Sequence, residues 1–258
     1  MNRINKLFQE KGKDILNIYF TAGYPNLNDT EVIIQELAKA GADLIEVGMP
    51  YSDPLADGET IQQSSSIALG NGMHLDLLFE QIKNARKHTD IPIILMGYVN
   101  QFMQYGAEKF IAKCVEVGVD GLILPDLPLF EYERDYKALF EENNITISFL
   151  ITPLTEEYRI KKVDELTRGF VYMVSSNATT GGQVSATNAK HEYFKRINEM
   201  KLKNPRLIGF GISDNKSFMD ACNFSNGAII GSAFIRALNK GKDDLSSTIS
   251  EFVSRIKN

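Results

Sequence analysis

Short apolar runs alternate with amphipathic stretches along almost the whole chain. In the amphipathic stretches, apolar residues return every three or four positions, which is typical of helices with one buried face. The apolar runs predict strands at residues 15–20, 43–47, 91–96, 120–124, 146–151, 170–174, 207–210 and 228–230. The amphipathic stretches predict helices at residues 1–10, 28–39, 60–68, 74–86, 107–117, 130–142, 155–166 and 189–201, from 215 onward, and at 232–239 and 244–256.

The order of these elements predicts the fold class. Eight short strands, each followed by a helix, imply a parallel α/β sheet with right-handed crossovers. We expect a single (β/α)8 TIM barrel domain over residues 1–258, with the extra N-terminal helix at residues 1–10 covering its bottom. The rival is an open doubly wound sheet. No G-x-G-x-x-G turn follows the first strand, and the strand count favours closure.

The segment at residues 43–62 carries the strongest candidate chemistry. Glu46 lies within an apolar strand, so we expect burial to raise its pKa. Asp57 follows on a loop rich in proline and glycine, where a carboxylate stays solvated and ionised. Two carboxyls in unlike environments form a general acid/base pair. The alternatives are a structural Glu46, paired with an arginine or a backbone N–H, and an Asp57 that caps the helix before Thr60.

Glycine turns after the last two strands predict a phosphate site. The seventh strand ends in the turn of Gly209, Phe210 and Gly211, and Gly231 and Ser232 follow the eighth. Backbone N–H groups converge on an anion at such turns, and the helix that opens at Ser232 points its positive end at it. Glycines required only for tight turns are the alternative. The polar stretch at 177–182 predicts a lid over the substrate, or else a connector without a role.

Charge and composition narrow the class of partner. The net charge of −5 and the pI near 5.4 argue against nucleic acid or an anionic membrane. No apolar run is long enough to span a bilayer, and no signal-type segment follows Met1. Cys114 and Cys222 are far apart and fit buried thiols in a reducing compartment, so we expect a cytoplasmic protein. No histidine falls at a strand end, which disfavours a triad and a histidine metal site.

Residues 46–62 read E-V-G-M-P-Y-S-D-P-L-A-D-G-E-T-I-Q, and this closely resembles the active-site segment of the tryptophan synthase alpha family. Glu59 stands where the family usually has proline. The resemblance extends to residues 21–25, 96–100 and 126–128, to Tyr172, and to the turns at Gly209 and Gly231. The family's lid reads S-R-x-G-V-T-G. Residues 175–181 lack its arginine and first glycine, while Thr180 and Gly181 align.

The resemblance implies a lyase of tryptophan biosynthesis. The family cleaves indole-3-glycerol phosphate to indole and D-glyceraldehyde 3-phosphate by a retro-aldol reaction, with no metal and no organic cofactor. It implies that Glu46 is the acid and then the base, and that Asp57 accepts the indole N1–H. The substrate-binding residues it implies are Tyr19, Tyr172, Thr180, Gly181, Phe210, Gly211, Gly231 and Ser232. Tyr19, Phe20, Met96 and Leu124 either form the walls of the indole pocket or pack in the core.

The resemblance also implies a partner. Alpha chains of the family join a pyridoxal-phosphate beta chain in an alpha2beta2 tetramer, and indole passes to it through a tunnel. Asp53, Pro54 and the loop around Asn100 and Phe102 would face that chain. The alternatives are a lyase that releases indole by itself and a silent binding subunit. Another phosphate-binding barrel enzyme would need a lysine at a strand end or a different acid pair.

Overall fold

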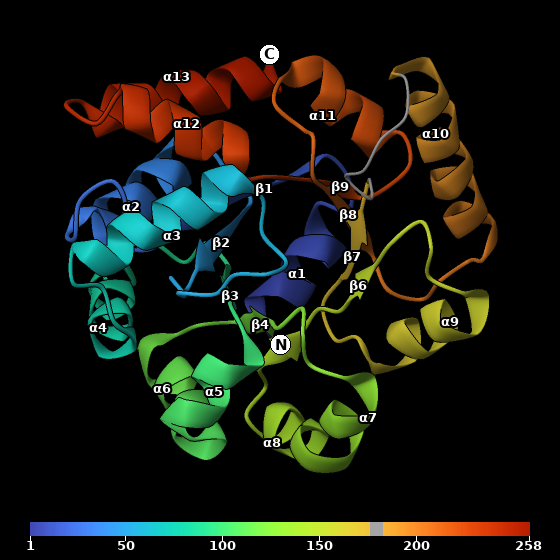
Figure 1. The fold of residues 1–258 in the computed structure, drawn as a ribbon, viewed down its shortest axis with the longest axis horizontal. Coiled ribbons are helices and arrows are strands. Elements are labelled where there is room, and N and C mark those ends of the chain that lie inside the picture. The colour runs from blue at the N-terminus through green and yellow to red at the C-terminus, as the bar shows by residue number, and fades with distance from the viewer. Residues whose placement is uncertain (176–182) are drawn as a thin grey trace.

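The computed structural model describes the backbone of residues 1–175 and 183–258, and the side chains of these residues except 183–190 (Figure 1). Its strands are β1 (Ile15–Thr21), β2 (Leu44–Gly48), β3 (Ile93–Met96), β4 (Gly121–Ile123), β5 (Thr146–Ile147), β6 (Leu150–Ile151), β7 (Val171–Val174), β8 (Arg206–Gly209) and β9 (Gly227–Ile230). Its helices are α1 (Arg3–Glu10), α2 (Asp29–Ala40), α3 (Glu59–Gly70), α4 (Leu75–Ala85), α5 (Val99–Tyr105), α6 (Ala107–Val117), α7 (Leu129–Glu131), the π-helix η1 (Tyr132–Tyr136), α8 (Lys137–Glu142), α9 (Glu157–Leu166), α10 (Gln183–Glu199), α11 (Asn215–Cys222), α12 (Ser232–Lys240) and α13 (Leu245–Lys257).

The strands form a parallel TIM barrel inside a ring of helices, which confirms the predicted fold (Figure 1). β1 pairs with β2 on one side and with β9 on the other. The predicted fifth strand is divided into β5, which pairs with β4, and β6, which pairs with β7. Between these two pieces, Ser148 N–H donates to Leu122 at 3.1 Å and Phe149 accepts from Tyr172 N–H at 2.9 Å. The continuous backbone at this point joins the two ends of the sheet.

The predicted N-terminal helix covers the bottom of the barrel. The Asn2 amide, just before α1, donates to the backbone oxygens of Asp120 at 2.7 Å and Asn144 at 2.8 Å. Arg3 forms an ion pair with Asp120 at 3.0 Å. These partners directly precede β4 and β5, so α1 lies against the N-terminal ends of the strands. The opposite end of the barrel remains free for a functional site.

Two helical regions differ in number or type from the sequence prediction, and α10 begins at Gln183 rather than at residue 189. The pattern predicts no helix between β3 and α6, but α5 occupies residues 99–105. It is too short for a clear period, and one fully buried side chain, Phe102, anchors it in the core. The single helix predicted at 130–142 is α7, η1 and α8 in succession. Tyr132, which begins the π-helical turn, is buried between the rings of Phe140 and Phe149.

Two glycines inside the barrel make room for tyrosine side chains. At Gly48 on β2, an added Cβ would overlap the hydroxyl of Tyr19 from β1. At Gly209 on β8, an added Cβ would overlap the hydroxyl of Tyr172 from β7. Both tyrosine hydroxyls therefore lie at the C-terminal ends of the strands. Only glycine at positions 48 and 209 leaves space for them.

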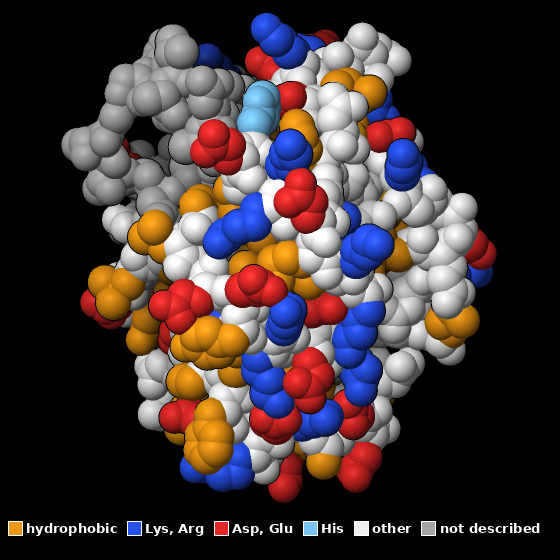
Figure 2. All heavy atoms as spheres, turned by 90° about the vertical axis from the view of Figure 1, so that its right-hand side faces the viewer, with side chains coloured by type: hydrophobic (Ala, Val, Ile, Leu, Met, Phe, Trp, Pro, Cys, Tyr) orange, Lys and Arg blue, Asp and Glu red, His pale blue; other side chains and the backbone are white. Residues whose placement is uncertain are grey.

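The outer surface carries charges of both signs. On the face that shows the right-hand side of Figure 1, lysine and arginine side chains are interspersed with aspartate and glutamate (Figure 2). Of the helices in the described part of the chain, none combines the length and the apolar character that crossing a membrane requires.

Candidate active site

A cavity of about 230 Å³ opens at the C-terminal ends of the strands. Its lining comes from β1, β2, β3, β7 and β9 and from the segments that follow β2, β8 and β9. The lining residues are Tyr19, Glu46, Asp57, Gly58, Ile61, Met96, Tyr172, Phe210, Gly211, Ile212, Ser213, Ile229, Gly231, Ser232, Ala233 and Arg236. The cavity thus brings together both predicted catalytic acids and every predicted substrate-binding residue except Thr180 and Gly181. Those two residues lie outside the described part of the chain.

Glu46 is a buried acid whose charge is strongly disfavoured. It is 1% exposed on β2, and its Oε2 accepts one hydrogen bond, from Asn17 Nδ2 on β1 at 2.9 Å. Burial raises its pKa to about 8; the Asn17 bond opposes this shift, and the nearby charge of Asp57 adds to it. Glu46 is therefore mainly protonated at pH 7. No arginine pairs with it among the described residues, so the structural alternative finds no support there.

Asp57 lies between solvent and the cavity. The Tyr98 hydroxyl donates to its Oδ2 at 3.0 Å, and the same hydroxyl accepts from Ala56 N–H at 3.0 Å. Burial raises the Asp57 pKa to about 6, and the bond from Tyr98 limits the rise. The expectation of a freely solvated carboxylate is thus wrong in degree, because Tyr98 holds Asp57 against the protein, but the group is still ionised at pH 7. Asp57 does not cap α3, whose N-cap is Gly58.

The turns that follow β8 and β9 also line the cavity. Phe210 and Gly211, which follow β8, both have left-handed backbones, with φ of 71° and 74°. The Ser175 hydroxyl donates to the backbone oxygen of Phe210 at 2.5 Å and holds this turn. Ser232 is the first residue of α12, so the positive end of this nine-residue helix points at the cavity. We call residues 210–211 and 231–232 the anion turn, after the phosphate-binding role that the glycine pattern predicts for them.

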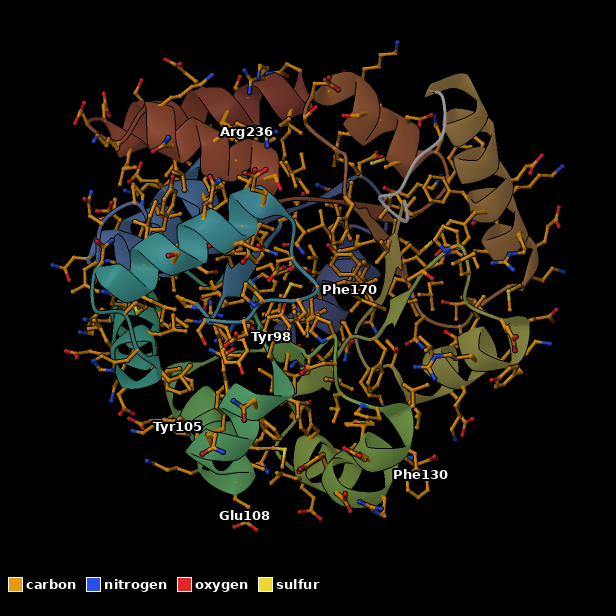
Figure 3. The ribbon with its side chains drawn as sticks, viewed as in Figure 1. Tyr98, Tyr105, Glu108, Phe130, Phe170 and Arg236 are labelled. Carbon is orange, nitrogen blue, oxygen red and sulfur yellow. The ribbon has the colours of Figure 1, made fainter. Side chains whose placement is uncertain are left out.

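Arg236 is a lining residue that the sequence prediction misses. It lies one helical turn after Ser232 on α12, and its Nη1 is 3.4 Å from Thr60 Oγ1 on α3. Figure 3 places it where α12 runs beside α3. Searching only the strand ends passes over it, because it stands inside a helix. The i, i+4 spacing from Ser232 on one helix face is the signal that finds it.

Of the four residues considered for the walls of the indole pocket, two line the cavity and two do not. Tyr19 and Met96 line the cavity, and Ile61, Ile212 and Ile229 add to its wall. Phe20 and Leu124 are buried but are absent from the lining, so core packing is their role.

The hydroxyl of Tyr172 makes no hydrogen bond to Glu46 among the described residues, although both groups line the cavity. The Tyr172 ring instead meets the Phe210 ring edge to face, with the two centroids 6.3 Å apart.

The predicted partner-facing residues lie on the loop that precedes Asp57 and on α5. Asp53 and Asn100 are exposed and Pro54 is half-buried, and Leu55 between the acids of this loop is 93% exposed. Asn100 Nδ2 donates to the Tyr51 hydroxyl at 3.0 Å, which ties α5 to the loop. The expectation that Phe102 faces a partner is wrong, because its ring is fully buried and packs edge to face on Phe110.

The remaining titratable candidates have local roles. The imidazole of His74 accepts from Leu77 N–H and caps α4. His88 is exposed, and His191 lies 3.3 Å from Asp220. Cys114 and Cys222 are free and buried. Within residues 1–175 and the described part of 183–258, no group of histidine, cysteine and acidic side chains is arranged to hold a metal ion.

Comparisons with known proteins agree with this geometry. The family model described as "Tryptophan synthase alpha chain" matches residues 5–258. The tryptophan synthase alpha chain of Flavobacterium psychrophilum is 55% identical over 256 residues, which cover 99% of this chain and 100% of that one. The solved alpha subunit from Legionella pneumophila strain Paris has a TM-score of 0.89 at 30% identity, with 100% and 97% of the two chains covered. A chain of the tryptophan synthase complex from Pyrococcus furiosus has a TM-score of 0.84 at 31% identity, with 95% and 98% covered. The chain therefore belongs to the tryptophan synthase alpha chain family.

Proposed function

We propose that the cavity binds indole-3-glycerol phosphate and that Glu46 and Asp57 together cleave it to indole and D-glyceraldehyde 3-phosphate. As a member of its family, the protein is a lyase of tryptophan biosynthesis. One observation carries the assignment of residues: the same cavity is lined by a neutral buried acid, by an ionised acid and by the anion turn. Neutral and ionised carboxyls perform different tasks at the same pH.

In the first step, neutral Glu46 gives its proton to C3 of the indole ring. The ring becomes an indolium cation, and its positive charge is shared with N1–H. The carboxylate of Asp57 accepts a hydrogen bond from N1–H and stabilises this charge, which is larger in the transition state than in the substrate. Tyr98 holds Asp57 in place for this contact.

In the second step, the carboxylate of Glu46 removes the proton from the hydroxyl on the carbon attached to C3. The electron pair of that O–H bond forms the carbonyl of the aldehyde, and the bond between the two carbons breaks. Its electrons return to the indole ring and neutralise the nitrogen. Glu46 ends protonated, as it began, so the cycle needs no external acid or base.

The phosphate lies, in this proposal, at the anion turn. The backbone N–H groups at Gly211, Gly231 and Ser232 and the N-terminal end of α12 provide an uncharged cradle. Arg236 adds a positive charge on the same side of the cavity. Met96 and the apolar side chains of Ile61 and Ile229, which line the same cavity, accommodate the indole. No lysine occurs among the described lining residues, so the alternative of a lysine-dependent barrel enzyme finds no candidate there.

The indole produced here passes, we infer, to a beta chain that carries pyridoxal phosphate, in an alpha2beta2 tetramer. The loop of Asp53, Pro54 and Leu55 supports this docking, because Asp53 and Leu55 are exposed and the loop continues directly into Asp57. A partner that contacts this loop also acts on the catalytic carboxylate. The alpha reaction itself requires no cofactor. We place it in the cytoplasm, where buried free thiols such as Cys114 and Cys222 are the ordinary state.

The test is indole release from indole-3-glycerol phosphate by the purified protein, with and without a beta chain. Glu46→Gln and Asp57→Asn are each expected to reduce kcat at least about 100-fold. Asp53→Asn is the matched control on the same loop: its carboxylate is exposed, so turnover without the beta chain stays near that of the parent protein. Full activity of Glu46→Gln would refute the assignment of the acid. Equal losses in the Asp53 and Asp57 variants without a beta chain would indicate a disturbed loop and refute the assignment of Asp57.

A further inference from the structure

The polar residue Asn17 lies in the interior of the barrel wall, in the middle of β1. Its neighbours in sequence are Leu16 and Ile18, and the residue is completely buried. Nδ2 of its amide donates to Glu46 Oε2 at 2.9 Å, while Oδ1 has no partner among the described residues. A buried carbonyl without a partner lowers the stability of the fold. Packing alone therefore favours an aliphatic residue at this position, and the amide must serve another purpose.

The Asn17 bond makes the two oxygens of Glu46 different. Oε2 is occupied by Asn17, whereas Oε1 is buried and has no hydrogen-bond partner in the described part of the chain. In a neutral carboxyl group, the oxygen that accepts an N–H bond is the carbonyl oxygen, and the proton resides on the other one. The proton of neutral Glu46 is thus directed to Oε1.

We propose that Asn17 is a positioning residue: by holding Glu46 through Oε2, it makes Oε1 the single oxygen that exchanges protons with the substrate. This inference rests on the role proposed above for Glu46. The same oxygen must first give a proton to the indole ring and then take one from the neighbouring hydroxyl. A carboxyl that rotated between these steps would bring the wrong oxygen forward, so a fixed carboxyl serves both steps without reorganisation.

The surroundings of Glu46 make this role measurable. The titratable groups that face it are Asp57 from the loop, Tyr19 from β1 and Tyr172 from β7. Its register neighbour on β3, Ile94, carries no charge. Burial keeps the pKa of both tyrosines well above the ordinary value, and that of Asp57 is about 6. Between about pH 7 and 9, Glu46 is consequently the group in this set that changes charge.

Replacing Asn17 shifts that titration in a defined direction. The amide bond stabilises the ionised form of Glu46, so its loss raises the pKa of Glu46 further. Because Glu46 starts the reaction protonated, kcat/KM falls as the pH rises through this pKa. In Asn17→Leu, which has the same branched shape without donors, the alkaline limb is expected to move up by about half a unit to one unit. The loss of orientation lowers kcat roughly 10- to 100-fold.

The experiment combines this pH profile with a readout that does not depend on activity. The infrared C=O band of neutral Glu46 is identified as the band that Glu46→Gln removes, and its disappearance is followed from about pH 6 to 10. Asn17→Leu and the smaller Asn17→Ser are both expected to move this titration to higher pH. Asn17→Ser keeps the test open if the leucine variant does not fold.

Thr146→Val is the matched control. It also removes a buried side-chain hydrogen bond on a barrel strand, here to Asp120 at the bottom, and leaves Glu46 untouched. It is expected to lower stability without shifting the band. An infrared titration unchanged in both Asn17 variants would overturn the proposal. A third outcome is an infrared titration that shifts while the alkaline limb of the kcat/KM profile does not. It would show that Asn17 contacts Glu46 but would refute the proposed catalytic role of Glu46, and with it the positioning role of Asn17.

Discussion

The raised pKa of Glu46 makes the stability of the protein depend on pH in an unusual direction. The folded-state value of about 8 lies above the ordinary 4.5, so between these values the native state binds more protons than the unfolded state. The free energy of unfolding therefore falls as the pH rises through this window. A shift of one unit corresponds to about 1.4 kcal/mol, so the whole shift corresponds to roughly 5 kcal/mol as an upper bound.

Glu46→Gln removes this dependence while keeping the shape of the side chain. The glutamine carbonyl still accepts from Asn17, but no charge forms inside the barrel at high pH. We expect the variant and the parent protein to be similar in stability near pH 5, and the variant to be more stable by several kcal/mol near pH 9. The assay is urea unfolding at a series of pH values, with the difference between the two proteins plotted against pH.

The difference curve isolates Glu46, because every other titrating group is common to both proteins. Glu108→Gln is the control: Glu108 is an exposed side chain on α6 (Figure 3), and folding changes its surroundings little, so we expect its difference curve to be flat. A flat curve for Glu46→Gln as well would refute the reasoning, since it would mean that ionising Glu46 in the folded protein costs no more than in the unfolded chain.

Three further predictions concern the surroundings of the acids. Arg236→Ala is expected to raise KM for the phosphorylated substrate roughly three- to tenfold at an unchanged kcat, as measured by indole release; an unchanged KM would exclude contact with the phosphate. Tyr98→Phe removes the hydrogen bond that keeps the pKa of Asp57 from rising further, so the acid limb of the kcat/KM profile is expected to move to higher pH. An acid limb at the same pH as in the parent protein would contradict this prediction. Gly48→Ala forces its Cβ against the Tyr19 hydroxyl and is expected to lower the free energy of unfolding by about 1–3 kcal/mol, which Tyr19→Phe in the same chain partly restores; no recovery would show strain elsewhere.

The strands and the acidic segment were predictable because they follow local rules. A buried parallel strand is a short apolar run, and an acid inside such a run, as at Glu46, stands out without any knowledge of the fold. The glycine turns at Gly211 and Gly231 were predictable too, because they come directly after apolar runs in the sequence. Asp57 lines the cavity, as its place in this segment predicts, but its partial burial depends on Tyr98, which lies just after the end of β3.

What the sequence did not reveal depends on contacts between distant elements. Asn17 looks like an interruption of a strand until Glu46 is seen beside it. Arg236 belongs to a helix, and the cavity reaches it only because α12 and α3 run together. Phe102 resembles an exposed loop residue because α5 is too short to show a period, and only the packed structure reveals its burial.

The pairing of β1 with both β2 and β9 has a consequence for the order in which the enzyme is made. On a ribosome, β1 and β2 emerge long before β9, which ends at Ile230. Until then β1 has an open edge, and non-local pairing of this kind is slow to form. Glu46 and Asp57 are also translated early, whereas Gly231 and Ser232 are translated after most of the barrel. The two carboxyl groups are therefore in the chain long before the turns proposed to hold the phosphate, and the site can be completed only when the last strand closes the barrel.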